Sequence, residues 1–375
     1  MKIVHIITGL GNGGAEHTLF KICKYDKSNQ HIVISFKGPG KYYLLLKNLG
    51  VKVYCLNANF FSIQKFFFLI KQLRSINPDI VQTWLIHADF VGGIAARLAG
   101  IKNIIWNIRY SNFEFGKAKL ATIIIIKILS KLSYLIPQFI IINSKRAKKI
   151  FEKDYDKKKL KYISNGIDLS ILKPNKIEKI NFKKKNKVKK QIPLIGNVAT
   201  YDPKKDHLNL IKALSLIRSS NIDFFCTLVG TYINQNNIEL TSEIKRLGLT
   251  AHVKLLGQND DIRQVMNGLD IYVQSSSYGE GFPNVVAEAM ACGTPCVVTD
   301  VGDAGFIVGK NGWVVPPKDP TKLANAIKKA ISEIGSNYWS KRRNKARSRI
   351  KENFNITKMI KCYNNLWIEA LEKNK

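Results

Sequence analysis

A repeated alternation of apolar, β-branched runs with helical patterns is the feature that most strongly limits the fold of this chain. Strand patterns in the N-terminal half are expected at residues 2–8, 31–36, 51–56, 80–83, 103–108 and 138–143, with a short last strand and turn within 161–168. The alternation restarts with strands at 193–199, 224–229, 253–255, 271–274 and 295–299. Apolar strands separated by helices indicate a parallel sheet covered on both faces. The sequence therefore predicts an α/β chain of two doubly wound, Rossmann-like domains that enclose one cleft.

A lysine-dense segment separates the two halves. Residues 183–190 read Lys-Lys-Lys-Asn-Lys-Val-Lys-Lys, and dense like charge with few apolar residues is typical of a solvated linker. We therefore expect an N-terminal domain over 1–173, a basic linker over 174–191 and a C-terminal domain over 192–352. Residues 353–375 have the apolar spacing of an amphipathic helix, which we expect to pack back on the first domain.

The chain is strongly basic. It has 60 Lys and Arg against 27 Asp and Glu, a net charge of +33 over 375 residues. This excess favours anionic partners, although a Lys-, Ile- and Asn-rich composition explains part of it equally well. The six cysteines are scattered, and Cys292 and Cys296 lack the spacing of a zinc site, which indicates a reduced, cytosolic protein. The first strand starts too early and is too short for a signal peptide.

The longest apolar stretch runs from Leu120 to Ile142. Lys127 and Lys131 interrupt it, and a lysine at mid-span costs about 2.5–3.5 kcal/mol on membrane-insertion scales. We therefore interpret it as an amphipathic helix over Lys117–Leu135 followed by a buried strand over Gln138–Asn143.

Two glutamates, Glu280 and Glu288, bracket the expected start of a helix. Gly279, Gly281 and Pro283 favour a tight turn before that helix. Glu280 is then expected in the loop and Glu288 one to two turns into the helix, with free N–H groups and a positive dipole end between them. This arrangement suits a ligand that has hydroxyl groups for the carboxylates and a negative group for the dipole, such as a nucleotide-sugar.

A glycine-rich loop, Gly9-Leu-Gly11-Asn-Gly13-Gly14, follows the first strand and precedes a helix. The pattern matches the dinucleotide fingerprint, but the second strand ends at Lys37 without the acidic residue that NAD requires. The loop is therefore expected to let a phosphate or substrate approach the backbone amides, and a purely structural turn is the alternative.

Three further residues are candidates because they follow strands. Lys205, in a loop beside Lys204, is placed to reach a phosphate as a point charge. His87 follows the strand at 80–83, where a histidine can bind substrate or move a proton. Arg109 ends the strand at 103–108 and could pair with a phosphate. The structural alternatives are a solvated lysine, a packed histidine and an ion pair.

A metal site is not expected. Asp154 and Asp156 form an Asp-x-Asp pair, but they lie among lysines and do not follow a buried strand. We interpret them as a solvated charge cluster.

Four segments in this order resemble glycosyltransferase family 4, a family of retaining enzymes with the GT-B architecture: Gly13-Gly-Ala-Glu16, Asn165-Gly-Ile-Asp168, the Lys205 loop and the segment from Glu280 to Glu288. The resemblance implies that Glu288 binds the donor ribose and that Glu280 contacts the donor sugar. It also implies that Lys205 and Gly14 approach the diphosphate, that His87 lies beside the reacting carbon, and that no metal or other cofactor is needed. The backbone amides of Phe282, Asn284 and Val285 would support sugar and phosphate, Glu16 would lie near the diphosphate or acceptor, and the base would lie near Leu256.

The sequence departs from the family pattern at Thr200. The family places an arginine five positions before the lysine, as a second diphosphate ligand. We expect either Arg109 or Lys204 to substitute, or a weaker diphosphate site.

The expected reaction is transfer of a sugar, with retention, from a nucleoside-diphosphate sugar to a hydroxyl of a glycan in cell-surface polysaccharide synthesis. A lipid-linked acceptor and contact with an anionic membrane are expected from the helix at 117–135, the aromatic run at 60–68 and the lysine excess. An ordinary core-facing helix is the equal alternative.

Two other classes of function stay open. A nucleotide-sugar epimerase or phosphorylase would share the fold, although no cofactor-binding lysine motif of a phosphorylase is found. A nucleic-acid-binding protein would interleave aromatic residues with its basic residues, and the run at 183–190 has none. We therefore expect no nucleic-acid partner.

Overall fold

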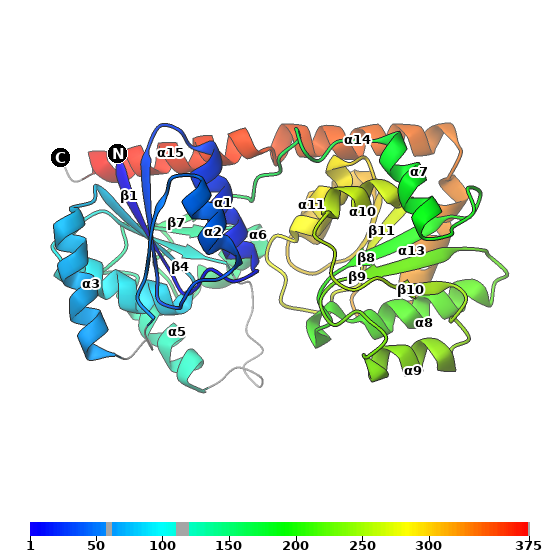
Figure 1. The fold of residues 1–375 in the computed structure, drawn as a ribbon, viewed down its shortest axis with the longest axis horizontal. Helices are drawn as coiled ribbons and strands as arrows, with labels where there is room; N and C mark the ends of the chain where they lie inside the picture. Colours follow the sequence, from blue (N-terminus) through cyan, green and yellow to red (C-terminus); the bar gives the residue numbers. More distant parts are fainter. Residues whose placement is uncertain (58–61, 110–119, 374–375) are drawn as a thin grey trace. The chain divides into compact units, whose positions relative to one another are not determined.

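The computed structural model describes residues 1–57, 62–109 and 120–373. The chain divides into two compact units. Unit 1 comprises Met1–Gly166 and Ile356–Lys375, and unit 2 comprises Ile167–Asn355. Each unit has one parallel sheet flanked by helices, as predicted (Figure 1).

Unit 1 contains a seven-stranded sheet in the order β3-β2-β1-β4-β5-β6-β7. Its strands are β1 (Lys2–Ile7), β2 (Gln30–Ser35), β3 (Lys52–Cys55), β4 (Ile80–Trp84), β5 (Ile104–Ile108), β6 (Phe139–Ile142) and β7 (Leu160–Tyr162). Its helices are α1 (Gly14–Tyr25), α2 (Lys41–Asn48), α3 (Ile63–Ile76), the π-helix η1 (Ala88–Gly92), α4 (Gly93–Leu98), α5 (Leu120–Leu132), α6 (Lys145–Phe151) and α15 (Ile356–Glu372).

Unit 2 contains a six-stranded sheet in the order β10-β9-β8-β11-β12-β13. Its strands are β8 (Leu194–Val198), β9 (Phe225–Val229), β10 (Val253–Leu255), β11 (Ile271–Gln274), β12 (Cys296–Thr299) and β13 (Trp313–Val315). Its helices are α7 (Lys176–Lys185), η2 (Pro203–Lys205), α8 (His207–Arg218), α9 (Ile238–Arg246), α10 (Ile262–Gly268), α11 (Asn284–Ala291), α12 (Ala304–Val308), η3 (Gly309–Asn311), α13 (Pro320–Glu333) and α14 (Asn337–Asn353).

The segment expected to be a basic linker over 174–191 is instead largely helical and belongs to unit 2. Phe182 of α7 is buried in the core of this unit. Lys179 and Lys183 lie 2.5 and 2.7 Å from the carboxylate of Asp270. Burial raises the pKa of Asp270, but the two lysines hold it below its usual range. Lysines of a segment expected to be solvated are thus partly used to compensate a buried charge. The change of unit falls at Gly166 and Ile167.

The apolar stretch from Leu120 to Ile142 forms helix α5 and strand β6, as predicted. The expected start of the helix at Lys117 lies outside the described residues. Within residues 1–57, 62–109 and 120–373, no helix combines the length and the apolar character that crossing a bilayer requires.

Helix α15 packs on unit 1, where the amphipathic pattern places it. Tyr363 and Trp367 are fully buried among residues of α1, β1 and β4. The indole of Trp367 donates to Oε1 of Gln82 at 2.9 Å, and the amide of Gln138 donates to the carbonyl of Ala370 at 2.8 Å. The helix therefore completes the polar partners of the sheet as well as its apolar cover.

Substitution of Tyr363 by Phe should destabilise the protein. The hydroxyl of Tyr363 accepts hydrogen bonds from Nδ2 of Asn107 at 3.0 Å and from Nη2 of Arg109 at 2.5 Å. Its loss leaves the buried amide of Asn107 and the partly buried guanidinium of Arg109 without this acceptor, which costs about 1–3 kcal/mol. We expect a lower midpoint of urea unfolding than for Cys362→Ala, an exposed position on the same helix. Equal midpoints for the two variants would show that these hydrogen bonds do not hold α15 in place.

Candidate active site

Both sheets change the direction of strand addition at one point. In unit 1, β1 lies between β2 and β4, and in unit 2, β8 lies between β9 and β11. The loops that follow such neighbouring strands leave toward opposite faces and open a crevice at the carboxyl ends. These loops carry the glycine-rich segment and His87 in unit 1, and Lys205 and Glu280 in unit 2. Residues predicted for the site therefore lie where a doubly wound sheet binds ligands.

Lys205 and Glu280 are brought together by hydrogen bonds between their two loops. The hydroxyl of Ser275 donates to the carbonyl of Lys205 at 2.8 Å, and the N–H of Ser277 donates to the carbonyl of Lys204 at 2.8 Å. Nζ of Lys205 then lies 2.5 Å from Oε1 of Glu280. The predicted phosphate-binding cation and the predicted sugar-binding carboxylate form one ion pair.

The carboxylate of Glu280 is buried and kept ionised. Its burial raises the pKa, but Lys205 and the hydrogen bonds from Ser276 and Gln274 hold the pKa below its usual range. The hydroxyl of Ser276 donates to Oε1 of Glu280 at 2.7 Å. Sequence reasoning missed Ser276 and Gln274. Their place at the end of β11, four and six residues before the glutamate, was the available signal. An ionised carboxylate held in this way accepts hydrogen bonds from hydroxyl groups.

The turn before α11 and the loop that contacts this turn each require a glycine. Gly279 has φ +75°, which side chains other than glycine rarely adopt. Gly302 has φ +57°, and a Cβ there would lie 2.3 Å from the carbonyl oxygen of Glu280. The N–H of Asp303 donates to the carbonyl of Gly281 at 2.9 Å. The loop after β12 therefore contacts the backbone of the Glu280 turn directly.

Glu288 lies on α11 with 8% of its surface exposed, as the predicted helix start requires. Burial raises the pKa of Tyr272 on β11, and Cys296, Glu280 and Glu288 raise it further. Both glutamates are buried, with 8% of their surfaces exposed.

The other residues predicted to contact the donor differ in which of their atoms are available to a ligand. Phe282 is buried, with its ring centroid 5.4 Å from that of Phe354, so its side chain belongs to the core and only its backbone can serve a ligand. Asn284 and Val285 begin α11. The N–H of Leu256 already donates to the carbonyl of Leu228 in the sheet. A base contact at Leu256 would therefore not use this N–H.

The position of the missing family arginine is exposed. Thr200 follows β8 and carries no charge. Nζ of Lys204 lies 3.5 Å from the carboxylate of Asp202, in a partly exposed ion pair. Lys205 is therefore the cation of this loop that contacts the glutamate.

In unit 1, Lys37 joins the predicted residues. Glu16 lies in the first turn of α1, where a Cβ on Gly13 would meet its Oε2 at 2.4 Å. Burial raises the pKa of Glu16, whereas Lys37 lowers it. Burial and Lys37 both lower the pKa of His87. In the sequence analysis, Lys37 served only to show that the second strand ends without an acidic residue. Its influence on Glu16 and His87 depends on tertiary contacts, which the sequence does not show.

The backbone that presents His87 is strained. Leu85 has φ +73°, which is unusual for a residue with a branched side chain. A π-helix follows at Ala88–Gly92. This form is rare in proteins overall, but where it occurs it is often at a functional site. The hydroxyl of Thr83 donates to Oδ1 of buried Asp89 at 2.5 Å, and burial raises the pKa of Asp89 to about 7. These contacts fix the turn in which His87 stands.

Arg109 already has partners within unit 1, so a ligand would have to compete with them if Arg109 substitutes for the missing arginine. Its guanidinium donates to Oδ1 of Asn165 and to the hydroxyl of Tyr363. It also lies 5.0 Å from the ring centroid of Trp84. Burial lowers its pKa. Arg109 therefore connects β5 to α15.

Two groups of residues contain side chains that can bind a metal. Asp156 lies 3.9 Å from Nζ of Lys159, within the expected charge cluster. The second group is His5, Cys23 and His31, whose ligand atoms lie within 4.8 Å of one another. The indole of Trp84 donates to Nδ1 of His5, so Nε2 of His5 donates to Nδ1 of His31, and Nε2 of His31 donates to Asp26. All four ring nitrogens have partners in this chain of hydrogen bonds, which fits a packed core better than a metal site.

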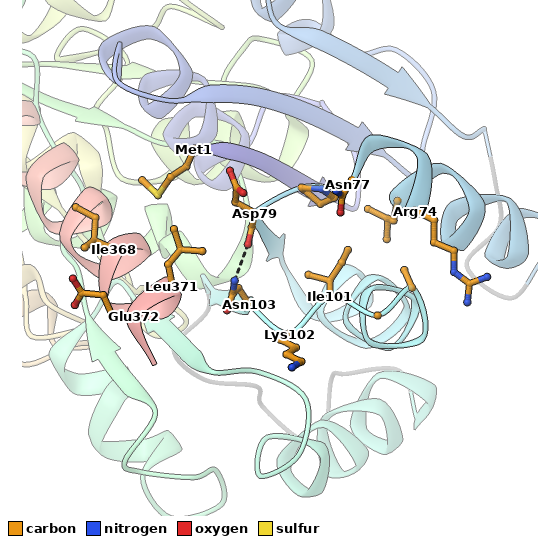
Figure 2. Close-up of a pocket in the computed structure, with 14 residues that line it drawn as sticks. Met1, Arg74, Asn77, Asp79, Ile101, Lys102, Asn103, Ile368, Leu371 and Glu372 are labelled. Atoms are coloured by element: carbon orange, nitrogen blue, oxygen red, sulfur yellow. Dashed lines mark hydrogen bonds between the residues drawn. The ribbon is translucent and has the colours of Figure 1, made fainter. Parts of the chain in front are cut away.

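A cavity of about 840 Å³ lies at the amino ends of β1, β4 and β5, lined by residues that include Arg74, Asp79, Lys102 and Glu372 (Figure 2). In Figure 2 the amide of Asn103 donates to the carbonyl of Asp79. This is the edge of the sheet opposite to Gly14 and His87. The lining mixes cations with carboxylates and favours no single class of ligand.

Comparisons with known proteins agree with this geometry. Residues 12–171 match the family model described as Glycosyltransferase Family 4, and residues 178–353 match the one described as Glycosyl transferases group 1. The chain is 26% identical to the Escherichia coli UDP-Gal:alpha-D-GlcNAc-diphosphoundecaprenol alpha-1,3-galactosyltransferase, covering 99% of this chain and 97% of that protein.

Two further proteins are similar. A Campylobacter jejuni N,N'-diacetylbacillosaminyl-diphospho-undecaprenol alpha-1,3-N-acetylgalactosaminyltransferase is 28% identical over 78% of this chain and 79% of its own length. The crystal structure of Anabaena HepE in complex with UDP superimposes with a TM-score of 0.87 at 23% identity, covering 98% and 100% of the two chains. The order of motifs, the two switch-point sites and these similarities lead to one conclusion: the chain belongs to glycosyltransferase family 4 and is a glycosyltransferase with the GT-B fold.

Proposed function

We propose that this enzyme transfers a hexose-type sugar, with retention, from a uridine-diphosphate sugar to a hydroxyl of a lipid-linked glycan during the synthesis of a cell-surface polysaccharide or glycoconjugate. The observation that carries the proposal is the Lys205–Glu280 ion pair at the switch point of unit 2. Relatives named as acting on diphosphoundecaprenol-linked acceptors, and a structural neighbour in complex with UDP-glucose, support the classes of acceptor and donor.

Donor binding would exchange partners within this ion pair. A diphosphate offers Lys205 a stronger acceptor than one carboxylate, and the sugar hydroxyls offer donors to Glu280. The N–H groups at the start of α11 and the positive end of its dipole would stabilise negative charge that develops on the leaving diphosphate. Glu288 would hold the ribose hydroxyls. The proposal requires no metal, because this chain's own groups supply the positive charge.

Unit 1 would bind the acceptor. Gly14, Glu16 and His87 stand at its switch point, and the lowered pKa of His87 keeps the imidazole neutral at pH 7. A neutral imidazole can accept a hydrogen bond from the acceptor hydroxyl. A lipid-linked acceptor places the reaction at a membrane surface, and we propose the cytoplasmic face of the plasma membrane.

The alternatives are less well supported. An epimerase would convert the donor without an acceptor, so incubation with donor alone distinguishes it from a transferase. A nucleic-acid-binding protein would present its arginines outward, but the arginines of α14 contact groups of their own unit. Arg342 donates to the carboxylate of Glu333, and Arg343 donates to the carbonyl of Gly293. Arg347 donates to the carbonyls of Leu172 and Ala291, and Arg349 to those of Ile307 and Phe306.

A UDP-sugar should raise the melting temperature more than GDP- or ADP-sugars, because a ligand that binds the folded state stabilises it by mass action. Glu288→Ala should weaken this shift, and Glu280→Gln should reduce the transfer rate by at least tenfold. Glu243→Ala, which removes a surface ion pair with Arg246, should change neither. Normal folding and wild-type transfer rates in both site variants would refute the assignment.

Lys205→Met should make stability fall as pH rises. In the wild type, Glu280 has a lowered pKa, so its contribution is present above its unfolded-state pKa of about 4.3 and is lost as pH falls. Without Lys205 the largest remaining influence is burial, which raises the pKa. The folded state then binds a proton more readily than the unfolded state, and stability declines from about pH 4.3 upward.

The test is the midpoint of urea unfolding at pH 5 and pH 7.5 without ligand. Lys205→Met should lose about 1–3 kcal/mol at pH 7.5 and clearly less at pH 5. Lys204→Met, at the neighbouring position, should lose little at either pH because its ion pair is partly exposed. Equal losses at both pH values, or equal behaviour of the two variants, would contradict the role of the pair.

A further inference from the structure

Helix α5 is apolar on both of its faces. Ile125 and Leu129 are buried against the sheet, as in any helix of a doubly wound domain. Leu120, Ile124 and Ile128 follow at intervals of four residues on the outward face, with 72, 49 and 40% of their surfaces exposed. A surface helix normally places polar residues there. Contiguous exposed apolar residues mark an interaction site.

Helix α3 repeats this arrangement. Leu69 and Leu73 are buried, whereas Ile63, Phe67 and Phe68 are 72, 63 and 53% exposed. Two of these are phenylalanines, whose large apolar rings gain much free energy when they are buried and leave that gain unused when exposed to water. The expected aromatic run began at Phe60, and its first two residues lie outside the described part of the chain. The described part of the run is enough to give α3 an apolar outer stripe.

The two stripes belong to one layer. Helix α3 packs against α4, α5 packs against η1, and η1 continues directly into α4. Buried residues of α3, α4 and α5 share one core cluster, whereas α1, α2 and α15 contribute to another. The layer is therefore on the face of the sheet away from α15 (Figure 1). We call its six outward residues the α3–α5 face: Ile63, Phe67, Phe68, Leu120, Ile124 and Ile128.

The charges around this face have one sign. Lys65 and Lys71 on α3 and Lys127 and Lys131 on α5 are exposed. In the described part of the chain, none of these four lysines forms an ion pair. Helices α3, η1, α4 and α5 contain one carboxylate, that of Asp89, and it is buried. Among the described residues, the face is therefore apolar, cationic and without exposed negative charge.

We propose that the α3–α5 face docks unit 1 on an anionic lipid bilayer. The phenylalanines and isoleucines would enter the boundary between headgroups and acyl chains, and the four lysines would contact anionic headgroups. The proposal deepens the proposed function, because it names the surface from which a lipid-linked acceptor is reached, but its physical basis is independent of the activity.

Charge complementarity selects this partner over two others. A second copy of the chain would bring four lysines against four lysines, at a cost in free energy. A nucleic acid would neutralise the lysines but leave the isoleucines in water. An anionic bilayer satisfies both kinds of residue at once.

The test is flotation of the full chain with vesicles. We expect binding to vesicles of phosphatidylcholine with phosphatidylglycerol, at least tenfold weaker binding to phosphatidylcholine alone, and weaker binding as salt increases. Ile124→Ser with Ile128→Ser should reduce binding at least tenfold. Lys127→Glu with Lys131→Glu should reduce it more than 25-fold, since each lysine near an anionic surface contributes about fivefold.

The matched control is Ile177→Ser with Ile180→Ser. These isoleucines are 70 and 65% exposed on α7, another lysine-rich helix, which carries Glu178 and lies in unit 2. The control should bind vesicles like the wild type. Melting temperatures of all variants should match, because every substituted side chain is exposed.

Three results would overturn the proposal: no binding to anionic vesicles, equal binding of control and α5 variants, or loss of a dimer in the α5 variant by sedimentation. The last result would make the face a self-interface. The melting-temperature shift with a UDP-sugar separates this proposal from the proposed function. A wild type that binds vesicles but shows no shift with a UDP-sugar keeps the docking and refutes the proposed donor, and the reverse result refutes the docking alone.

Discussion

The position of the switch-point loops in both units depends on one constraint, the reversal of strand order within a parallel sheet. Parallel strands need crossover helices, and these helices leave the sheet on opposite faces only where the order reverses. In unit 1 this point lies between β1 and β4, and in unit 2 between β8 and β11. The same rule therefore places a glycine loop with His87 in one unit and Lys205 with Glu280 in the other. The chemistry differs between the units because the loops differ, and the scaffold is the same.

Helix α15 supplies hydrogen-bond partners to buried polar groups of unit 1. The sheet face beneath α15 contains Gln82 and Asn107, which are hydrogen-bonded to Trp367 and Tyr363 of this helix. The chain of hydrogen bonds from Trp84 through His5 and His31 lies beside α15, with the ring centroid of Trp367 5.9 Å from that of His31. Burial, followed by the nearby His31, lowers the pKa of His5, and the chain of hydrogen bonds ends at the carboxylate of Asp26. Buried polar groups of this kind are costly when their partners are absent. The last residues of the polypeptide are thus part of the core of the first domain.

The sequence predicted what local patterns control. Apolar runs located the strands of both sheets except β13, a three-residue edge strand that was not predicted. The glycines and proline around Glu280 located the turn and the helix that carries Glu288. It did not predict contacts between distant positions. Helix α7 was missed because its stability comes from Phe182 in the core and from Asp270, some ninety positions later. The guanidinium of Arg109 is hydrogen-bonded to Tyr363, at a separation of 254 residues. The loops of Lys205 and Glu280 meet through backbone carbonyls, which composition does not report.

The net charge of +33 combines two different uses of cations. Arginines of α14 and Arg109 direct their guanidinium groups to carbonyl oxygens, carboxylates and hydroxyls, where a planar group with five donors satisfies several acceptors at once. Lysines on α3 and α5 stay at the surface, beside exposed isoleucine and phenylalanine. Net charge alone therefore overstates how much of the basic character is available to a partner. The combination that distinguishes the α3–α5 face is local, because free lysines, outward apolar residues and the absence of exposed carboxylates coincide there in the described structure.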